Sequence, residues 1–192
     1  MEKPIVVALF FAILLAASAH AETTDFLELV KTATALQVQE ALQKGADLNE
    51  RDSYGRTLLM HAAMFNRDAD VINVLFKAGA DINARDNYGW TALMLAARGN
   101  QNPDVISAFV QVGADPNARD RYTLTALMYA AISNQNPEVI TMLLNTGAEV
   151  TAKDVLGRTA FDYALENVNL KSTTPSNSSR KRRSKSGGLT GL

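Results

Sequence analysis

A repeat of 34 residues is the feature that most constrains how this chain of 192 residues can fold. Four aspartates and four glycines recur at this interval: Asp52, Asp86, Asp120 and Asp154, and Gly45, Gly79, Gly113 and Gly147. A fixed period of this length is typical of stacked units, each of which can bury its apolar surface only against a neighbouring copy. The sequence therefore predicts a solenoid.

Each repeat contains two short helical segments separated by a loop. In the clearest copy they are Thr91 to Arg98 and Pro103 to Gln111. The second segment starts with Asn102 as an N-cap and Pro103 at the first helical position, both of which favour the beginning of a helix. Gly113 stands where a left-handed C-cap ends such a helix. These signals predict an all-α fold.

Two recurring patterns, Thr-Ala-Leu-Met-x-Ala-Ala and Gly-Ala-Asp-x-Asn-Ala-x-Asp-x-x-Gly, resemble ankyrin repeats over about residues 24–170. The resemblance implies an ankyrin-repeat solenoid of paired antiparallel helices with projecting β-hairpin turns. The family's Thr-Pro-Leu-His is replaced here by sequences such as Thr91-Ala-Leu-Met94, so methionine packing is expected in place of a histidine network. Thr123 stands where other copies have glycine, which predicts a hairpin turn of different shape or a strained one.

The predicted domain organisation has three parts. Residues 1–21 are interpreted as a signal peptide, because Lys3 precedes an apolar run from Ile5 to Ala17 and Ala19-His-Ala21 matches a cleavage site. Residues 22–170 form the repeat domain, with a degenerate first repeat at about 24–50, full repeats at about 53–86, 87–120 and 121–154, and a partial C-terminal cap at about 155–170. Residues 171–192 are expected to be a disordered basic tail.

The same reading predicts where the protein is located. The apolar run of 13 residues is shorter than the roughly 20 that a membrane span requires. We therefore expect cleavage near Ala21, no transmembrane span in the mature chain, and a periplasmic or secreted product.

The sequence offers little for catalysis or metal binding. It contains no cysteine, and His61 is the one histidine left after removal of the signal peptide, so the usual zinc and nucleophile sites cannot be assembled. The recurring aspartates are expected to lie roughly 8–10 Å apart, too far to share a calcium ion, and to accept backbone hydrogen bonds within their turns. No GxxxxGK phosphate loop is present. The sequence predicts a protein that is not an enzyme and uses no cofactor.

The family resemblance also implies where a partner protein would bind, namely the hairpin tips and the exposed face of the first helices. Tyrosine, tryptophan and arginine, which often dominate binding energy, are common at these positions. A structural alternative is that the three tip tyrosines stack on one another as a ladder. The predicted protein-binding residues are Tyr54, Arg56, Met64, Tyr88, Trp90, Arg98, Arg121, Tyr122, Leu124, Ile132, Leu156 and Arg158.

The formal charge of −1 conceals an uneven distribution, with about −7 on residues 22–170 and +6 on residues 171–192. No aromatic residue interrupts the basic residues 180–185, so any contact with a polyanion would be nonspecific and salt-sensitive, and no specific nucleic acid is expected. The leading hypothesis is an exported, monomeric, non-catalytic protein that binds another protein as an inhibitor, immunity factor or stabilising partner of a periplasmic enzyme. The alternative is an envelope or polyanion tether acting through the tail.

Overall fold

The computed structural model describes residues 26–167 and residue 170; the predicted signal peptide and basic tail, including residues 180–185, lie outside the described residues. A helical turn at residues 26–29 comes first. The helices that follow are α2 (Ala35–Gln43), α3 (Leu58–Phe65), α4 (Ala69–Lys77), α5 (Ala92–Gly99), α6 (Pro103–Gln111), α7 (Ala126–Ser133), α8 (Pro137–Asn145) and α9 (Ala160–Glu166).

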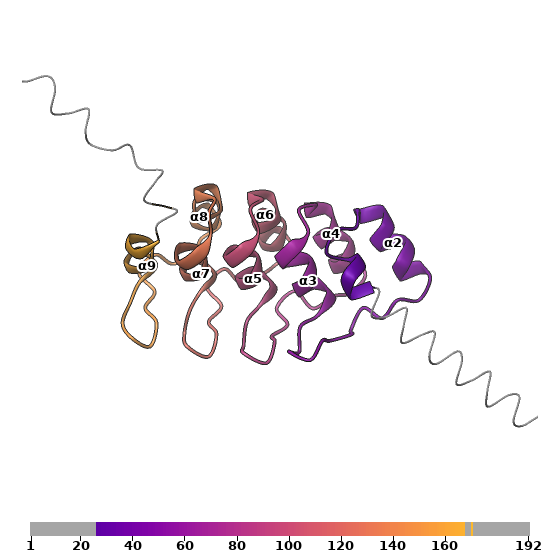
Figure 1. Cartoon of the computed structure of the whole chain (residues 1–192), viewed down its shortest axis with the longest axis horizontal. Helices are drawn as coiled ribbons and strands as arrows, with labels where there is room; N and C mark the ends of the chain where they lie inside the picture. Colours follow the sequence, from indigo (N-terminus) through magenta and orange to yellow (C-terminus); the bar gives the residue numbers. More distant parts are fainter. Residues whose placement is uncertain (1–25, 168–169, 171–192) are drawn as a thin grey trace, which may run out of the picture.

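These helices form two parallel layers, as the repeat predicted. Helices α3, α5, α7 and α9 lie side by side in an inner layer, and α2, α4, α6 and α8 lie side by side in an outer layer (Figure 1). The loops that enter the inner helices project from one edge of the stack (Figure 1). The chain is therefore an all-α solenoid, and within the described residues the hairpin loops contain no strand beyond one isolated bridge between Arg51 and Thr57.

Side-chain caps determine where the helices begin. Thr91 is the N-cap of α5 and its hydroxyl accepts a hydrogen bond from the Met94 N–H. Asn102 caps α6 in the same way through the Asp104 N–H, and Pro103 follows at the first helical position. A side-chain oxygen at this position satisfies an N–H that has no partner within the helix. The predicted start at Pro103 is confirmed, and α5 begins one residue after the predicted Thr91, which is its N-cap.

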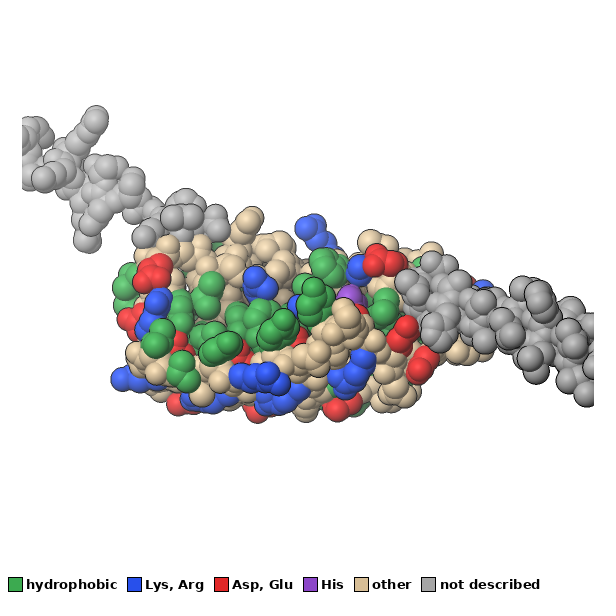
Figure 2. Space-filling view, turned by 60° about the horizontal axis from the view of Figure 1, so that its bottom comes forward, with side chains coloured by type: hydrophobic (Ala, Val, Ile, Leu, Met, Phe, Trp, Pro, Cys, Tyr) green, Lys and Arg blue, Asp and Glu red, His purple; other side chains and the backbone are tan. Residues whose placement is uncertain are grey.

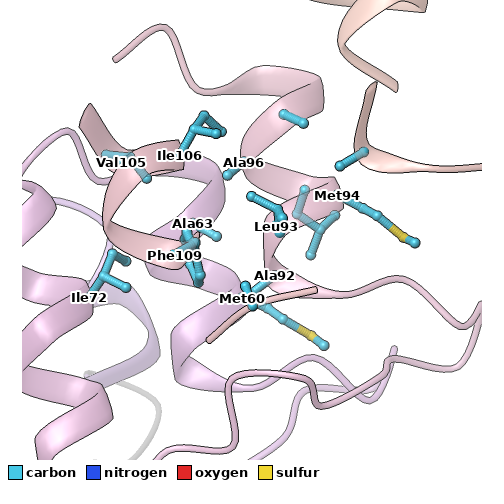
Figure 3. Close-up of a cluster of buried hydrophobic side chains, with 14 of the residues drawn as sticks. Met60, Ala63, Ile72, Ala92, Leu93, Met94, Ala96, Val105, Ile106 and Phe109 are labelled. Atoms are coloured by element: carbon cyan, nitrogen blue, oxygen red, sulfur yellow. The ribbon is translucent and has the colours of Figure 1, made fainter. Parts of the chain in front are cut away.

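The core lies between the two layers and continues from one repeat to the next. Met60, Met94 and Met128 are fully buried, which confirms methionine packing at the position where the family pattern has histidine. Phe109 of α6 is also fully buried. Figure 3 shows side chains from inner and outer helices meeting in this cluster. Such continuity explains why a single repeat has no core of its own.

A ladder of buried asparagines connects the loops between inner and outer helices. Asn100 donates from Nδ2 to the carbonyls of Ala63 (3.1 Å) and Asn66 (2.7 Å), both in the preceding repeat. Buried carbonyls without a partner are costly, so this amide satisfies groups that water cannot reach. The same double hydrogen bond is made by each member of the ladder: Asn66, Asn100, Asn134 and Asn167.

The hairpin turn is set by the aspartate that begins it, as predicted. Asp86 Oδ1 accepts hydrogen bonds from the N–H groups of Tyr88 (2.8 Å) and Trp90 (2.9 Å). Gly89 then adopts positive φ, at +82°, and its N–H donates to the Asp86 carbonyl at 3.0 Å. Thr123 makes the equivalent hydrogen bond at 3.1 Å with φ of 61°. The turn therefore keeps its shape, and Thr123 carries the backbone strain expected of a β-branched residue there.

Candidate protein-binding site on the hairpin face

The predicted binding residues lie on one surface, which we call the hairpin face. It consists of the hairpin turns at residues 51–57, 85–91, 119–125 and 153–159 together with the exposed side chains in the last turns of α3, α5 and α7. Figure 2 shows basic side chains along the hairpin edge of the molecule, beside a band of hydrophobic ones.

Arginines hold neighbouring hairpins in a defined arrangement. Arg85 donates from Nη1 to the carbonyl of Gly89 (2.8 Å) in its own hairpin and to that of Arg119 (2.6 Å) in the next. Arg51 makes the corresponding bonds to Gly55 (2.7 Å) and to Arg85 (3.1 Å). The hairpin face is consequently assembled from turns that are tied together before any partner binds.

The three tip tyrosines are exposed and do not form the ladder that was considered as an alternative. Tyr54, Tyr88 and Tyr122 are 51%, 48% and 60% exposed, respectively. Among the described residues, the one close ring pair joins Trp90 to Tyr129, and no tip tyrosine contacts another. Neighbouring tips instead meet through backbone, as where the Asn87 N–H donates to the Tyr54 carbonyl at 2.9 Å.

Trp90 is half-buried, which differs from the exposed side chain expected from the sequence. Its ring centroid lies 4.5 Å from that of Tyr129 in the next repeat, with the planes inclined by 51°. The guanidinium carbon of Arg98 lies 5.2 Å from the same ring centroid, within the range of a cation–π interaction. Trp90 thus joins two repeats, and a role for its remaining exposed surface in binding stays a prediction.

A second set of side chains behind the hairpins was not found from the sequence. The second carboxylate oxygen of the repeated aspartate accepts from a residue nine positions later on the inner helix. Asp52 pairs with His61 Nε2 at 3.1 Å, Asp120 with the Tyr129 hydroxyl at 2.6 Å, and Asp154 with that of Tyr163 at 2.5 Å. Comparing the residue nine positions after each repeated aspartate would have identified these polar partners from the sequence.

Burial and these hydrogen bonds shift the acidities of the groups involved. Burial, assisted by the hydrogen bond to Asp120, raises the pKa of the Tyr129 hydroxyl, so it remains a donor. Burial also lowers the pKa of His61, although the nearby Asp52 acts in the opposite direction. Neutral His61 can still donate from Nε2 to the carboxylate, which can only accept. His61 is therefore a buried residue held by a structural hydrogen bond.

The second full repeat breaks this pattern. Leu95 occupies the position of the polar partner, so Asp86 Oδ2 is buried and has no hydrogen-bond partner. The nearest cationic group is Arg56 of the preceding repeat, whose Nε lies 3.7 Å from that oxygen and is itself buried without a hydrogen bond. Arg56 is therefore directed toward Asp86, across the boundary between two repeats.

The other predicted residues differ in accessibility. Arg121 and Leu156 are exposed at the tips, and Arg98 and Ile132 are exposed at the ends of α5 and α7. Three are partly buried: Met64, Leu124 and Arg158.

Arg158 is occupied within its own repeat, because its Nη2 lies 2.8 Å from Glu166 Oε2 and its guanidinium carbon 4.2 Å from the Tyr163 ring centroid. Phe65, which was not predicted, is 51% exposed beside Met64.

The described residues contain no cluster of three or more histidine, aspartate or glutamate side chains arranged to hold a metal ion. In the same part of the chain, every helix is too short or too polar to cross a membrane. The hairpin face presents aromatic, aliphatic and arginine side chains on a backbone that is held in place by hydrogen bonds between neighbouring hairpins. Such a surface is suited to contact with a macromolecule.

Comparison with known proteins agrees with this architecture. The family model for ankyrin repeats (3 copies) matches residues 13–120, 66–154 and 100–173. No curated protein gave a match. Members of the matched family are generally non-catalytic scaffolds for protein–protein interaction.

Proposed function

Because the chain belongs to the ankyrin-repeat family, we propose that it is a non-catalytic module whose hairpin face binds a partner protein. The tip tyrosines carry this proposal. They recur at one position of three successive hairpins, each is about half exposed, and none stacks on another tip. Exposed aromatic side chains in register are typical of binding hot spots.

The finer proposal is that the mature protein is exported and acts on a periplasmic or secreted enzyme as an inhibitor, immunity factor or stabilising partner. It is supported by the charged start, the apolar run and the Ala19-His-Ala21 pattern of the first residues, and by the absence of cysteine. A tether acting through the basic residues 180–185 is the competing function, favoured by the positive charge of the tail.

The proposal is tested by replacing two tip tyrosines together, Tyr88→Ala and Tyr122→Ala, in the mature chain. Immobilised protein is used to capture envelope proteins, which are identified and quantified. We expect the amount of the main captured protein to fall at least tenfold, since each hot-spot residue contributes about 2 kcal/mol or more to the free energy of binding. The melting temperature should hardly change, because both rings are exposed.

Phe76→Ala is the matched control, since Phe76 is an aromatic residue 42% exposed on the outer helix α4. Its capture should equal that of the unmodified protein. If both tyrosines can be removed without loss, but deletion of residues 171–192 abolishes capture, the tether is the correct function.

A further inference from the structure

The hairpin turns and the rest of the described repeat domain carry opposite charge. The hairpin turns at residues 51–57, 85–91, 119–125 and 153–159 contain seven basic and four acidic residues, a net charge of +3. The remainder of residues 26–167 contains five basic and thirteen acidic residues, a net charge of −8. A protein with an acidic body therefore presents a basic edge at the place proposed to bind a partner.

Three of the four acidic residues of the hairpins are buried, which makes the outward charge more positive than the count suggests. Asp86, Asp120 and Asp154 are only 6%, 7% and 8% exposed. Each of the four accepts two backbone N–H groups with Oδ1. Within the described residues these carboxylates pair with none of the exposed arginines, and the arginine that lies near one of them, Arg56 beside Asp86, is itself partly buried.

Several basic side chains of the hairpin turns consequently have no acidic partner among the residues that the structure describes. Arg85 is held by backbone carbonyls through Nη1 and forms no ion pair with any described residue, although a guanidinium has five N–H donors. Arg121, at the tip, has neither a hydrogen bond nor an ion pair from its side chain within the described part of the chain. Four residues one repeat apart make up what we call the basic row: Arg51, Arg85, Arg119 and Lys153.

We propose that the hairpin face binds an extended acidic segment of a partner protein, lying along the basic row with its carboxylates on the arginines and its apolar side chains on the tip tyrosines. This inference rests on the proposed function and specifies the partner's chemistry. The planar guanidinium group of arginine can donate two parallel hydrogen bonds to a carboxylate. Guanidinium groups that the backbone already holds lose little conformational entropy on binding.

The repeat also sets the spacing of the segment. Stacked helices lie about 8–10 Å apart, so successive members of the basic row are separated by about that distance. A polyproline II helix rises about 3.1 Å per residue with three residues per turn, which places every third side chain on one side at intervals of about 9 Å. A carboxylate at every third position therefore matches one basic residue per repeat.

The test uses a fluorescent peptide of five Glu-Leu-Pro units and the mature chain, with binding measured by fluorescence anisotropy. Arg121→Glu should weaken binding at least tenfold, and circular dichroism should show unchanged folding because that side chain has no polar partner. Arg67→Glu makes the same charge change in the exposed loop after α3, away from the hairpins, and should alter binding less than twofold. Added salt should weaken binding to the unmodified protein.

Peptides with Lys or Gln in place of Glu are the ligand controls and should bind at least tenfold more weakly. Equal binding of the Gln and Glu peptides, equal effects of the two arginine variants, or no binding of the Glu peptide would each overturn the inference. These failures are separate from failure of the proposed function. If the peptide test fails but the tyrosine variant loses envelope capture, the hairpin face still binds a partner protein, and that partner is recognised without acidic groups.

Discussion

At the level of single residues, the repeated aspartate connects the hairpin to the inner helix. One carboxylate oxygen sets the turn, as Asp120 does for the N–H groups of Tyr122 and Leu124. The other accepts from the inner helix, where Tyr129 supplies a hydroxyl. Where both hydrogen bonds are made, as at Asp52, Asp120 and Asp154, a single side chain thus fixes the direction in which the hairpin leaves the stack. In the first full repeat that connection depends on His61, whose ionisation varies with pH.

His61 should make the stability of the protein fall in mildly acidic solution. Burial lowers its pKa in the folded state, so the unfolded chain binds a proton more readily than the folded one. The stability from neutral His61 is therefore complete above the unfolded pKa of about 6.5 and decreases below it, by up to about 1.4 kcal/mol per pH unit. We expect His61→Tyr, which copies the later repeats, to remove this loss between pH 7.5 and 5.5.

Urea unfolding at the two pH values measures the effect. The carboxyl groups protonate in a lower range, since unperturbed Asp and Glu have pKa values of about 4, so they contribute little in this window. An identical decrease for the variant and the unmodified protein would show that His61 is not responsible.

At the level of elements, the loops between inner and outer helices are stabilised by buried amides. Asn134 donates to the carbonyls of Ala97 (2.8 Å) and Asn100 (3.0 Å), which end the inner helix of the preceding repeat. Each loop therefore completes the hydrogen bonding of its neighbour, and the helices stack in a fixed register. Apolar packing alone does not impose such a register, because it has little directionality.

Asn100→Ala should destabilise the protein by about 3 kcal/mol, because it leaves two buried carbonyls without donors. The loss is measured as the change in free energy of unfolding in urea. Asn145→Ala, at an exposed position at the end of α8, should change it by less than about 0.5 kcal/mol. Similar values for the two variants would mean that the ladder does not stabilise the stack.

At the level of the whole molecule, the ends of the described solenoid differ from its interior. Leu127 in α7 and Phe161 in α9 occupy the same position of their repeats, but they are 2% and 68% exposed. The difference arises because α9 covers Leu127, whereas no further inner helix among the described residues covers Phe161. Burial in a repeat protein is thus a property of the neighbour as much as of the residue.

The two positions should respond very differently to truncation. Leu127→Ala should reduce the free energy of unfolding by about 3 kcal/mol, because it leaves a cavity in the core. Phe161→Ala should reduce it by less than about 1 kcal/mol, since most of the ring is already in water. Chemical denaturation of both variants provides the comparison, and a larger loss at Phe161 would show that its surface is covered in solution.

The period, the caps and the turn signals were sufficient to predict the architecture. Asn102 with Pro103 marks the start of a helix through local chemistry, and the aspartate turn is equally local. Positive φ at Thr123 was also foreseeable, because the equivalent position is glycine in the other hairpins. These features depend on residues close together in the chain, so they can be recognised without the fold.

Contacts between repeats were decided by tertiary structure alone. The sequence left stacked tip tyrosines open as an alternative and predicted Trp90 as a binding residue, but it is Trp90 that lies against Tyr129, 39 residues later in the chain. The asparagine ladder and the isolated Asp86–Arg56 pair likewise join neighbouring copies. The period shows that copies stack, but the side chains that meet depend on the angle and separation of the helices, which packing across the whole stack determines.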